Sequence, residues 1–200
     1  MKSYLFPFLI GYLLGSVSIS ILLSKLVLRD DVRAHGSGNA GATNVARVYG
    51  MRAGLLTLGG DILKTLLSGF FGWLLGGQTG LIIAFTGCFL GHCWPVYFGF
   101  HGGKGVAVAV AVTPFIDLRV FLILFVLFFL VFALSRRVSL GSVACALALP
   151  IAYWLLNPGL SLKFRFCVFV CVLLVFQHKE NLVRLLHGQE PEFRPRSAKE

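Results

Sequence analysis

The chain has 200 residues, of which 57% are apolar and 13% charged, and it carries a formal net charge of +10. With a mean hydropathy of +0.85 it cannot be a soluble domain, because a fold of this size leaves too much surface exposed to hide so many apolar side chains. The same composition excludes disordered, collagen-like and disulfide-rich classes. The sequence therefore predicts an all-α integral membrane protein, a polytopic bundle of transmembrane helices in a single domain over residues 1–200.

Apolar segments follow one another along the chain, separated by charges and by clusters of Gly and Pro. A membrane span needs about 20 apolar residues, and the segments nearest this length are 5–28, 53–76, 81–100, 120–134, 140–156 and 164–176. A shorter segment, 106–116, rises only about 16 Å at 1.5 Å per residue. Seven helices result if it crosses the bilayer and six if it folds back, and the cleaner separation of charges favours seven. A polar cytoplasmic tail, 177–200, closes the chain.

Lys and Arg residues in the loops, the two ends of the chain and the first turn of the last span predict the orientation, because cytoplasmic loops of membrane proteins accumulate them. In the seven-helix arrangement four lie on one side: Lys2, Arg119, Lys163 and Arg165. Twelve lie on the other: Arg29, Arg33, Arg47, Arg52, Lys104, Arg136, Arg137, Lys179, Arg184, Arg194, Arg196 and Lys199. We therefore expect the N-terminus outside and the tail in the cytoplasm. The same bias accounts for the net charge, so no nucleic-acid partner is expected.

The segment 29–52 is polar and too rich in Gly to cross lipid. Its core holds Ser37, Gly38, Asn39, Gly41, Thr43 and Asn44, and Arg47 follows. Small residues let main-chain N–H groups approach an anion closely, as phosphate nests do. A flexible linker shares the Gly and Ser content, so composition leaves an anion site and a linker as alternatives.

A second polar cluster, HGGKG, follows the segment 81–100 and contains Gly102, Gly103 and Lys104. This turn brings one Lys beside main-chain amides and before the N-terminus of the next helix, an arrangement that attracts anions. It is not a Walker P-loop, since the GxxxxGK[ST] spacing is absent. We interpret Lys104 as an anion ligand; the alternative is an ordinary cytoplasmic loop charge.

Three further sets of polar residues lie within or beside the spans. Asp61 and Lys64 are three apart and share a helix face; intramembrane charges indicate functional sites, and a structural ion pair is the alternative. Ser142 stands near the cytoplasmic start of the sixth predicted helix, as a helix cap or a ligand contact. His178 and Asn181 are one helical turn apart, with an Arg one turn further; the alternative there is an interfacial amphipathic tail.

Common catalytic motifs are missing from the sequence. No His is followed five positions later by Asp, so the His-x4-Asp pair of acyl-CoA and acyl-carrier acyltransferases is absent, and neither GxSxG nor HExxH occurs. The five cysteines lie in apolar runs without zinc-site spacing and indicate small buried side chains. No metal and no cofactor are expected. What remains is a set of anion-binding groups at one membrane face.

Taken together, these motifs resemble one family. HGSGNAGATNVAR, DILK, GHCWPVYFGFHGGKGVA and HKENLVRLLHGQE are similar, in order and spacing, to the PlsY family of bacterial acyl-phosphate:glycerol-3-phosphate 1-acyltransferases. The likeness runs from about residue 11 to residue 190. Three departures are visible: His101 stands where the family usually has Lys, Val108 where it often has Thr, and Thr65 where Gly commonly follows the Asp-x-x-Lys.

The resemblance implies transfer of a fatty acyl group from acyl phosphate to the 1-hydroxyl of sn-glycerol 3-phosphate, giving 1-acylglycerol 3-phosphate (lysophosphatidic acid) and phosphate. It also implies a multi-pass protein surrounded by lipid in the bacterial inner (plasma) membrane, with its site on the cytoplasmic side and no obligate protein partner. A small-anion transporter is the alternative class, since transporters also show basic and Gly-rich helix interruptions. The chain shows no internal repeat, which favours the enzyme.

The resemblance also assigns roles to residues. The catalytic set is expected to be Ser37, Asn39, Lys104, His178 and Asn181. Substrate-binding residues are expected at Gly38, Gly41, Thr43, Asn44, Arg47, Asp61, Lys64, Gly102, Gly103 and Ser142. An acyl phosphate is already activated, so no covalent enzyme nucleophile is needed. His178 either removes the proton from the attacking hydroxyl or orients the phosphate that removes it, and we favour the second.

Overall fold

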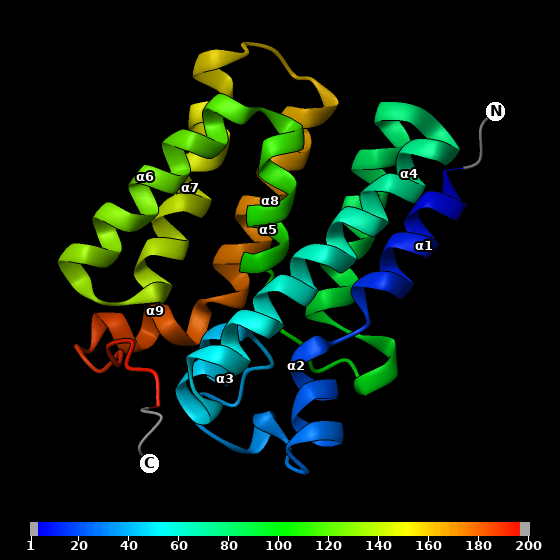
Figure 1. Ribbon diagram of the computed structural model, residues 1–200. Coiled ribbons are helices and arrows are strands. Elements are labelled where there is room, and N and C mark those ends of the chain that lie inside the picture. The colour runs from blue at the N-terminus through cyan, green and yellow to red at the C-terminus, as the bar shows by residue number, and fades with distance from the viewer. Residues whose placement is uncertain (1–3, 197–200) are drawn as a thin grey trace. The chain divides into compact units, whose positions relative to one another are not determined.

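The structure, a computed structural model, describes residues 4–196, and its regular secondary structure over that range is entirely helical (Figure 1). The predicted all-α class is therefore confirmed. The chain divides into two compact units, residues 1–111 with 194–200 and residues 112–193, which are described separately below. A single domain over 1–200 stays a prediction. Lys2 and Lys199, which entered the charge comparison, lie outside the described residues.

In the first unit, the span expected over 5–28 is interrupted. Helix α1 (Leu5–Gly15) ends before residues 16–18, and α2 (Ile19–Leu22) continues into a π-helical turn over Leu23–Val27. At this break the Val17 carbonyl accepts from Lys64 Nζ at 2.8 Å, and the Ser16 side chain accepts from the main-chain N of Val96, in the turn after α4, at 3.3 Å. Irregular backbone inside a membrane protein is tolerated where the protein itself satisfies it in this way.

Helix α4 (Met51–Cys93) contains the second predicted span and residues 81–93 of the third; the rest of the third, 94–100, forms a turn instead of helix. Its backbone leaves the helical region at Gly76 and Gly77, where φ at Gly77 is +59°, a conformation that glycine adopts without strain. Gly72 and Gly80 face each other across this break, and a Cβ on Gly80 would lie 2.2 Å from the Gly72 carbonyl oxygen. The segment is therefore a helical hairpin whose two arms pack closely at small residues.

Helix α1 packs along α4, and the two ribbons lie side by side in Figure 1. Glycines make the contact close: a Cβ on Gly11 would lie 2.1 Å from the Ala84 carbonyl oxygen, and one on Gly15 would lie 2.3 Å from that of Cys88. Small residues allow such backbone approach between membrane helices, where dispersion contacts rather than hydrophobic burial drive association. This packing holds the C-terminal arm of α4, which carries His92, against α1.

The polar segments of the first unit contain short helices. The loop expected over 29–52 contains a 3₁₀ turn over Val32–Ala34 and helix α3 (Ala42–Tyr49), which packs against α4. After α4, a 3₁₀ turn over Val96–Phe98 precedes the glycine cluster, and α5 (Val106–Ile116) begins directly after it, as expected.

The second unit contains four helices that pack in chain order. They are α6 (Leu118–Ser135), α7 (Val138–Leu156), α8 (Leu162–Gln177) and α9 (Lys179–Leu186). Asp117 caps the N-terminus of α6, accepting from the main-chain N of Arg119 at 2.8 Å, and its other oxygen accepts from Asn157 Nδ2 at 2.9 Å. The predicted spans 120–134, 140–156 and 164–176 thus match α6, α7 and α8 within two residues at each end.

Length and hydropathy identify membrane spans among the described residues. Four stretches qualify, Leu5–Val27, Met51–Phe98, Leu118–Ser135 and Val138–Leu156, and a fifth is added if α8 and α9, bent by 58°, count as one. The second stretch is the hairpin and so supplies two apolar arms, while α5 is a shorter apolar helix. These properties agree with a polytopic membrane protein; the number of crossings and the orientation remain predictions.

Candidate functional site

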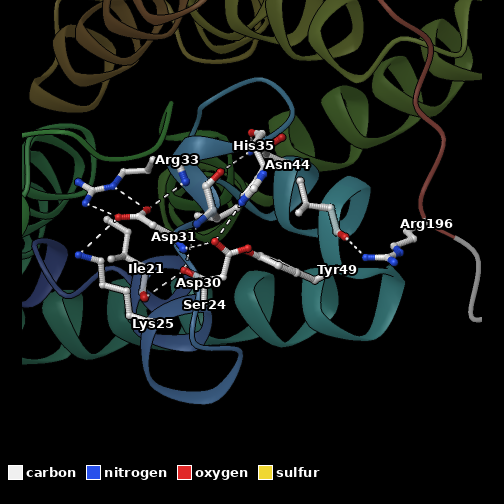
Figure 2. Close-up of polar contacts among 12 residues, drawn as sticks. Ile21, Ser24, Lys25, Asp30, Asp31, Arg33, His35, Asn44, Tyr49 and Arg196 are labelled. Carbon is white, nitrogen blue, oxygen red and sulfur yellow. Dashed lines mark hydrogen bonds and ion pairs between the residues drawn. The ribbon is translucent and has the colours of Figure 1, made fainter. Parts of the chain in front are cut away.

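Two carboxylates, those of Asp30 and Asp31, hold the loop before α3 in place by accepting hydrogen bonds. Asp30 accepts from the Tyr49 hydroxyl at 2.8 Å, from His35 Nε2 at 3.0 Å and from the main-chain N of Asp31 at 2.7 Å (Figure 2). These hydrogen bonds lower the pKa of Asp30, and burial together with the Asp30 carboxylate raises the pKa of Tyr49 to about 12. Tyr49 therefore stays protonated at neutral pH and ties the end of α3 to the start of the loop.

Asp31 organises the opposite side of this loop. Its carboxylate receives Nε and Nη2 of Arg33 at 3.0 and 2.8 Å, and Lys25 Nζ lies 3.4 Å away (Figure 2). The Arg33 guanidinium holds the pKa of Asp31 well below its ordinary value. The remaining guanidinium nitrogen, Nη1, donates to the Phe98 carbonyl at 3.1 Å, which links the loop to the 3₁₀ turn after α4.

Asn44 fixes the glycine-rich core of the loop. Its Oδ1 accepts from the main-chain N of Ser37 at 2.9 Å, and its Nδ2 donates to the carbonyls of Val32 and His35 at 3.2 and 3.0 Å. Gly36 has φ +60° and Gly38 has φ +69°, so the chain turns where glycine is favoured. The segment is therefore an ordered turn, and the alternative of a flexible linker is wrong.

The other predicted residues of this loop lie on or beside α3. Gly41 precedes the helix, Thr43 lies in its first turn, and Arg47 lies in its last turn. Ser37 is exposed, whereas Asn39 and Arg47 are half-buried. The loop thus presents several polar side chains on a backbone that its own hydrogen bonds hold in place.

Asp61 and Lys64 form a buried ion pair inside α4, as their spacing predicted. Lys64 Nζ lies 2.8 Å from Asp61 Oδ1, and the side chains are 6% and 2% exposed. The ammonium group also contacts the Val17 carbonyl at 2.8 Å and His92 Nδ1 at 3.1 Å. The ammonium group therefore has one ion-pair partner and two hydrogen-bond acceptors, which is how a buried charge is compensated.

The glycine cluster is fastened to the end of α4. The main-chain N of Gly102 donates to the Cys93 carbonyl at 3.2 Å, and that of Gly103 donates to the His92 carbonyl at 3.0 Å. A Cβ on Gly103 would lie 2.2 Å from His92 Nε2 and 3.1 Å from the Ala40 carbonyl oxygen. The turn that carries the half-buried Lys104 therefore packs against both His92 and the glycine-rich loop.

In the second unit, the carboxylate of Glu190 gathers the polar residues of α7 and α9. Its Oε1 accepts from Ser139 Oγ and from Asn181 Nδ2, each at 2.6 Å, and its Oε2 accepts from Arg184 Nε at 2.8 Å. Burial raises the pKa of Glu190, but these three hydrogen bonds outweigh it and leave the pKa below its ordinary value. Asn181 and Arg184 share one helix face, as predicted, and that face meets Glu190.

His178 lies at the junction between α8 and α9 and is buried, with 3% of its surface exposed. Its Nδ1 is 2.8 Å from the Leu174 carbonyl, which accepts hydrogen bonds only, so the ring proton sits on Nδ1. Ser142, expected near the start of α7 as a cap or a ligand contact, is not a helix cap. It lies inside the helix and its hydroxyl donates to the Val138 carbonyl at 2.9 Å, while Arg137 occupies the N-cap position.

The structure thus brings the predicted residues together in two sets, one in each unit. The first contains the glycine-rich loop, the Asp61–Lys64 pair and the turn bearing Lys104; the second contains Ser142, His178 and Asn181. Over the described residues, no group of three or more His, Cys, Asp or Glu side chains is arranged to hold a metal ion. The first set supplies main-chain and side-chain donors with the cations Arg47 and Lys104, and the second supplies hydrogen-bonding side chains; together these are the groups that bind phosphate.

Comparison with known proteins identifies the family of the chain. The family described as Glycerol-3-phosphate acyltransferase matches residues 5–188. The chain belongs to the glycerol-3-phosphate acyltransferase family. It is accordingly an acyltransferase, and the alternative of a small-anion transporter is wrong.

Relatives in this family cover almost the whole chain. The glycerol-3-phosphate acyltransferase of Finegoldia magna is 37% identical over 192 residues, which is 94% of this chain and 96% of the relative. That of Syntrophotalea carbinolica is 38% identical over 200 residues, 97% of this chain and 100% of the relative. That of Actinobacillus succinogenes is 40% identical over 182 residues, 90% of this chain and 89% of the relative.

Solved structures show the same fold. The crystal structure of PlsY, an integral membrane glycerol 3-phosphate acyltransferase, in its glycerol 3-phosphate form matches with a TM-score of 0.87 and 34% identity, over 96% of each chain. The lysophosphatidic acid form matches with a TM-score of 0.84 and 33% identity, over 96% of this chain and 95% of that one. The predicted PlsY resemblance and the integral membrane class are therefore confirmed.

Two residues of this acyltransferase with central contacts were missing from the predicted site. His92 bridges Lys64 and Gly103, and Glu190 connects Ser139 with Asn181. Both lie inside the motifs that carried the family resemblance, so their neighbourhood was visible in the sequence. Their contact partners could not be predicted from the sequence, because 28 residues separate His92 from Lys64 and 51 separate Glu190 from Ser139.

Proposed function

We propose that this acyltransferase uses an acyl phosphate as donor and glycerol 3-phosphate as acceptor, and that it acylates the 1-hydroxyl. The match to a PlsY structure in its glycerol 3-phosphate form supports the acceptor, and the match to the lysophosphatidic acid form supports the product. The observation that carries the proposal is the glycine turn: Gly102 and Gly103 hold Lys104 beside α5, whose N-terminus begins two residues later. Main-chain amides, a cation and a helix N-terminus together favour a phosphate.

The reaction needs little from the protein beyond binding and orientation. The hydroxyl oxygen of glycerol 3-phosphate attacks the acyl carbonyl carbon, the bond from that carbon to the phosphate oxygen breaks, and the hydroxyl proton ends on the released phosphate. A mixed anhydride is already activated, so no covalent enzyme intermediate is required. This agrees with the absence of His-x4-Asp and GxSxG motifs from the sequence.

Individual roles are proposed from the chemistry of each residue. Ser37, Asn39 and the main chain of the 38–44 turn hold the donor phosphate and the reacting carbonyl oxygen. Lys104 and Arg47 supply positive charge to phosphate, and Ser142, His178 and Asn181 supply hydrogen bonds to the glycerol phosphate or the leaving phosphate. Asn44 acts on the turn rather than on substrate, because the turn itself takes up its polar atoms.

The donor is tested with the purified full-length chain in lipid or detergent. Mixed with glycerol 3-phosphate and an acyl phosphate, it should release phosphate and form lysophosphatidic acid in equal amounts. With acyl-CoA or acyl-carrier protein in place of acyl phosphate, turnover should be at background, since these thioesters carry no anhydride phosphate for the turn to bind. Equal turnover with acyl-CoA would refute the donor assignment.

We further propose a seven-helix protein of the bacterial inner membrane with its N-terminus outside and its site facing the cytoplasm. Labelling single cysteines in intact cells tests this, in a background where the five native cysteines are replaced. Ser37→Cys and His101→Cys should resist an impermeant thiol reagent, whereas Leu160→Cys should react; all three side chains are exposed. Gly103 is unsuitable because a side chain there meets His92. Strong external labelling at position 101 contradicts the seven-helix orientation.

A further inference from the structure

The ring of His92 joins two parts of the first unit, the buried ion pair and the glycine turn. It lies in the last turn of α4, with 5% of its surface exposed. On one edge, Nδ1 lies 3.1 Å from Lys64 Nζ and 3.6 Å from Asp61 Oδ1. On the other edge, Nε2 faces Gly103 and lies only 2.2 Å from the place where a Cβ would stand. The ring therefore fills the space between the ion pair and the turn.

Lys64 determines where the ring carries its proton. An ammonium group donates and never accepts, so His92 Nδ1 is the acceptor of the contact at 3.1 Å. The ring proton consequently sits on Nε2, at the edge that faces Gly103. Rotation of the ring would break the contact with Lys64 and leave one proton of a buried ammonium without an acceptor, which is costly. The Asp61–Lys64 pair thus holds the ring in one orientation.

Main-chain bonds attach the turn at the same place. The Gly103 main-chain N donates to the carbonyl of His92 itself at 3.0 Å, and the Gly102 N donates to the next carbonyl, that of Cys93, at 3.2 Å. A Cβ on Gly102 would lie 2.1 Å from the His92 carbonyl oxygen, so only glycine lets the turn pack this closely against the backbone of His92. Lys104 is the next residue. Any displacement of His92 is therefore passed to the backbone that carries Lys104.

We propose that His92 is a positioning residue of this acyltransferase: held by the Asp61–Lys64 pair, it sets the position of the Gly102–Gly103 turn and, through the turn, of Lys104. The inference rests on the proposed function in one respect only, namely that Lys104 binds a substrate phosphate. The buried Asp61–Lys64 pair then contributes to activity as well as to stability, because it orients the ring that supports the turn.

A double-mutant cycle tests the contact between the ring and the turn. Gly103→Ala inserts a methyl group against Nε2 and should lower kcat/KM about a hundredfold, because small misplacements of binding groups have large effects. His92→Ala removes the ring and should lower kcat/KM about tenfold or more through the loosened turn. In the combined variant the alanine at 103 occupies part of the vacated space, so activity should be at least tenfold higher than the product of the two single effects. Two effects that multiply independently overturn the proposal.

A kinetic signature separates positioning from a general loss of structure. Lys104→Ala identifies the substrate whose KM depends on the turn. His92→Ala should raise the KM of that same substrate about tenfold, whereas a merely structural defect lowers kcat by reducing the amount of active enzyme. His187→Ala, which removes an exposed histidine just after α9, is the matched control and should leave both KM values unchanged. An unchanged KM in a folded His92→Ala variant overturns the proposal.

Two further measurements keep the test decisive. If His92→Ala does not fold, His92→Asn replaces it: the amide oxygen can accept from Lys64, but the shorter side chain does not reach Gly103, so the same rise in KM is expected. Direct binding of glycerol 3-phosphate and of a non-hydrolysable acyl phosphate analogue is measured alongside turnover. If wild-type protein binds these ligands but does not transfer the acyl group, the proposed function fails while weaker binding by the His92 variants still supports positioning. Undiminished binding of both ligands overturns positioning alone.

Discussion

Lys64 Nζ lies 2.8 Å from Oδ1 of Asp61, one turn away on the same face of α4, and both side chains are buried. Removing one partner of such a pair leaves an uncompensated charge, which costs about 3–5 kcal/mol. Asp61→Asn and Lys64→Met should therefore each lower the free energy of unfolding strongly, measured by denaturation of the purified protein in detergent. The double variant Asp61→Asn/Lys64→Met should lose less than the sum of the two, and additive losses would show that the pair is not coupled.

Removing the Asn44 side chain should open the glycine-rich turn. Asn44→Ala abolishes three hydrogen bonds to the segment 32–37. At about 1 kcal/mol net for each bond, amide hydrogen exchange in this segment should accelerate by about a hundredfold. Asn44→Asp keeps the acceptor for the main-chain N of Ser37 and should show a smaller acceleration. Equal exchange in wild type and Asn44→Ala would show that the side chain does not hold the turn.

Loss of the Lys104 charge should impair catalysis without unfolding the protein. Charge-assisted contacts to phosphate are strong when partly desolvated, so Lys104→Ala should lower kcat/KM by on the order of 10²-fold or more. Lys25→Ala is the matched control, because Lys25 is exposed and its contact with Asp31 is a surface ion pair of little energetic weight. Near-normal activity of Lys104→Ala would show that Lys104 is an ordinary loop charge and not a phosphate ligand.

Amide variants of His178 decide whether it is a base or a phosphate ligand. Its Nδ1 proton is directed to the Leu174 carbonyl, so substrate contact is expected through Nε2, which accepts a proton in the neutral ring and donates a hydrogen bond to phosphate in the imidazolium. Gln places an amide nitrogen near Nε2 and can donate a hydrogen bond, but it cannot act as a base at neutral pH. We expect His178→Gln to keep more activity than His178→Asn and His178→Ala. If all three fall equally and the acidic limb of the pH–rate profile disappears, His178 is the base.

Glu190 should make the free energy of unfolding depend on pH in the acidic range. Its pKa lies below the ordinary value of 4.5, so ionised Glu190 favours the folded state. That contribution is complete above the unfolded-state pKa and is lost as the pH falls through the folded-state pKa. The stability advantage of wild type over Glu190→Gln should therefore be constant near neutral pH and shrink as the pH falls below 4.5. A difference that does not change with pH would show that the carboxylate is not the stabilising group.

Features that depend on local sequence could be predicted from the amino-acid sequence alone. Composition excluded a soluble fold, and the apolar segments located α6, α7 and α8 because hydropathy and helix length are local quantities. The pairing of Asp61 with Lys64 was predictable because residues three apart share a helix face in any helix. The family resemblance added the acyltransferase activity, which no periodicity or spacing could supply.

Contacts between distant segments were decided only by the tertiary structure. The break after α1 is stable because Lys64 reaches the Val17 carbonyl, and the interior position of Ser142 follows from where α7 begins. Glu190 and His92 acquire their partners through folding: one carboxylate binds Ser139 and Asn181, and one ring separates Lys64 from Gly103. Sequence patterns report on neighbours within a few residues of each other, whereas these contacts exist because packing brings together atoms that the chain keeps far apart.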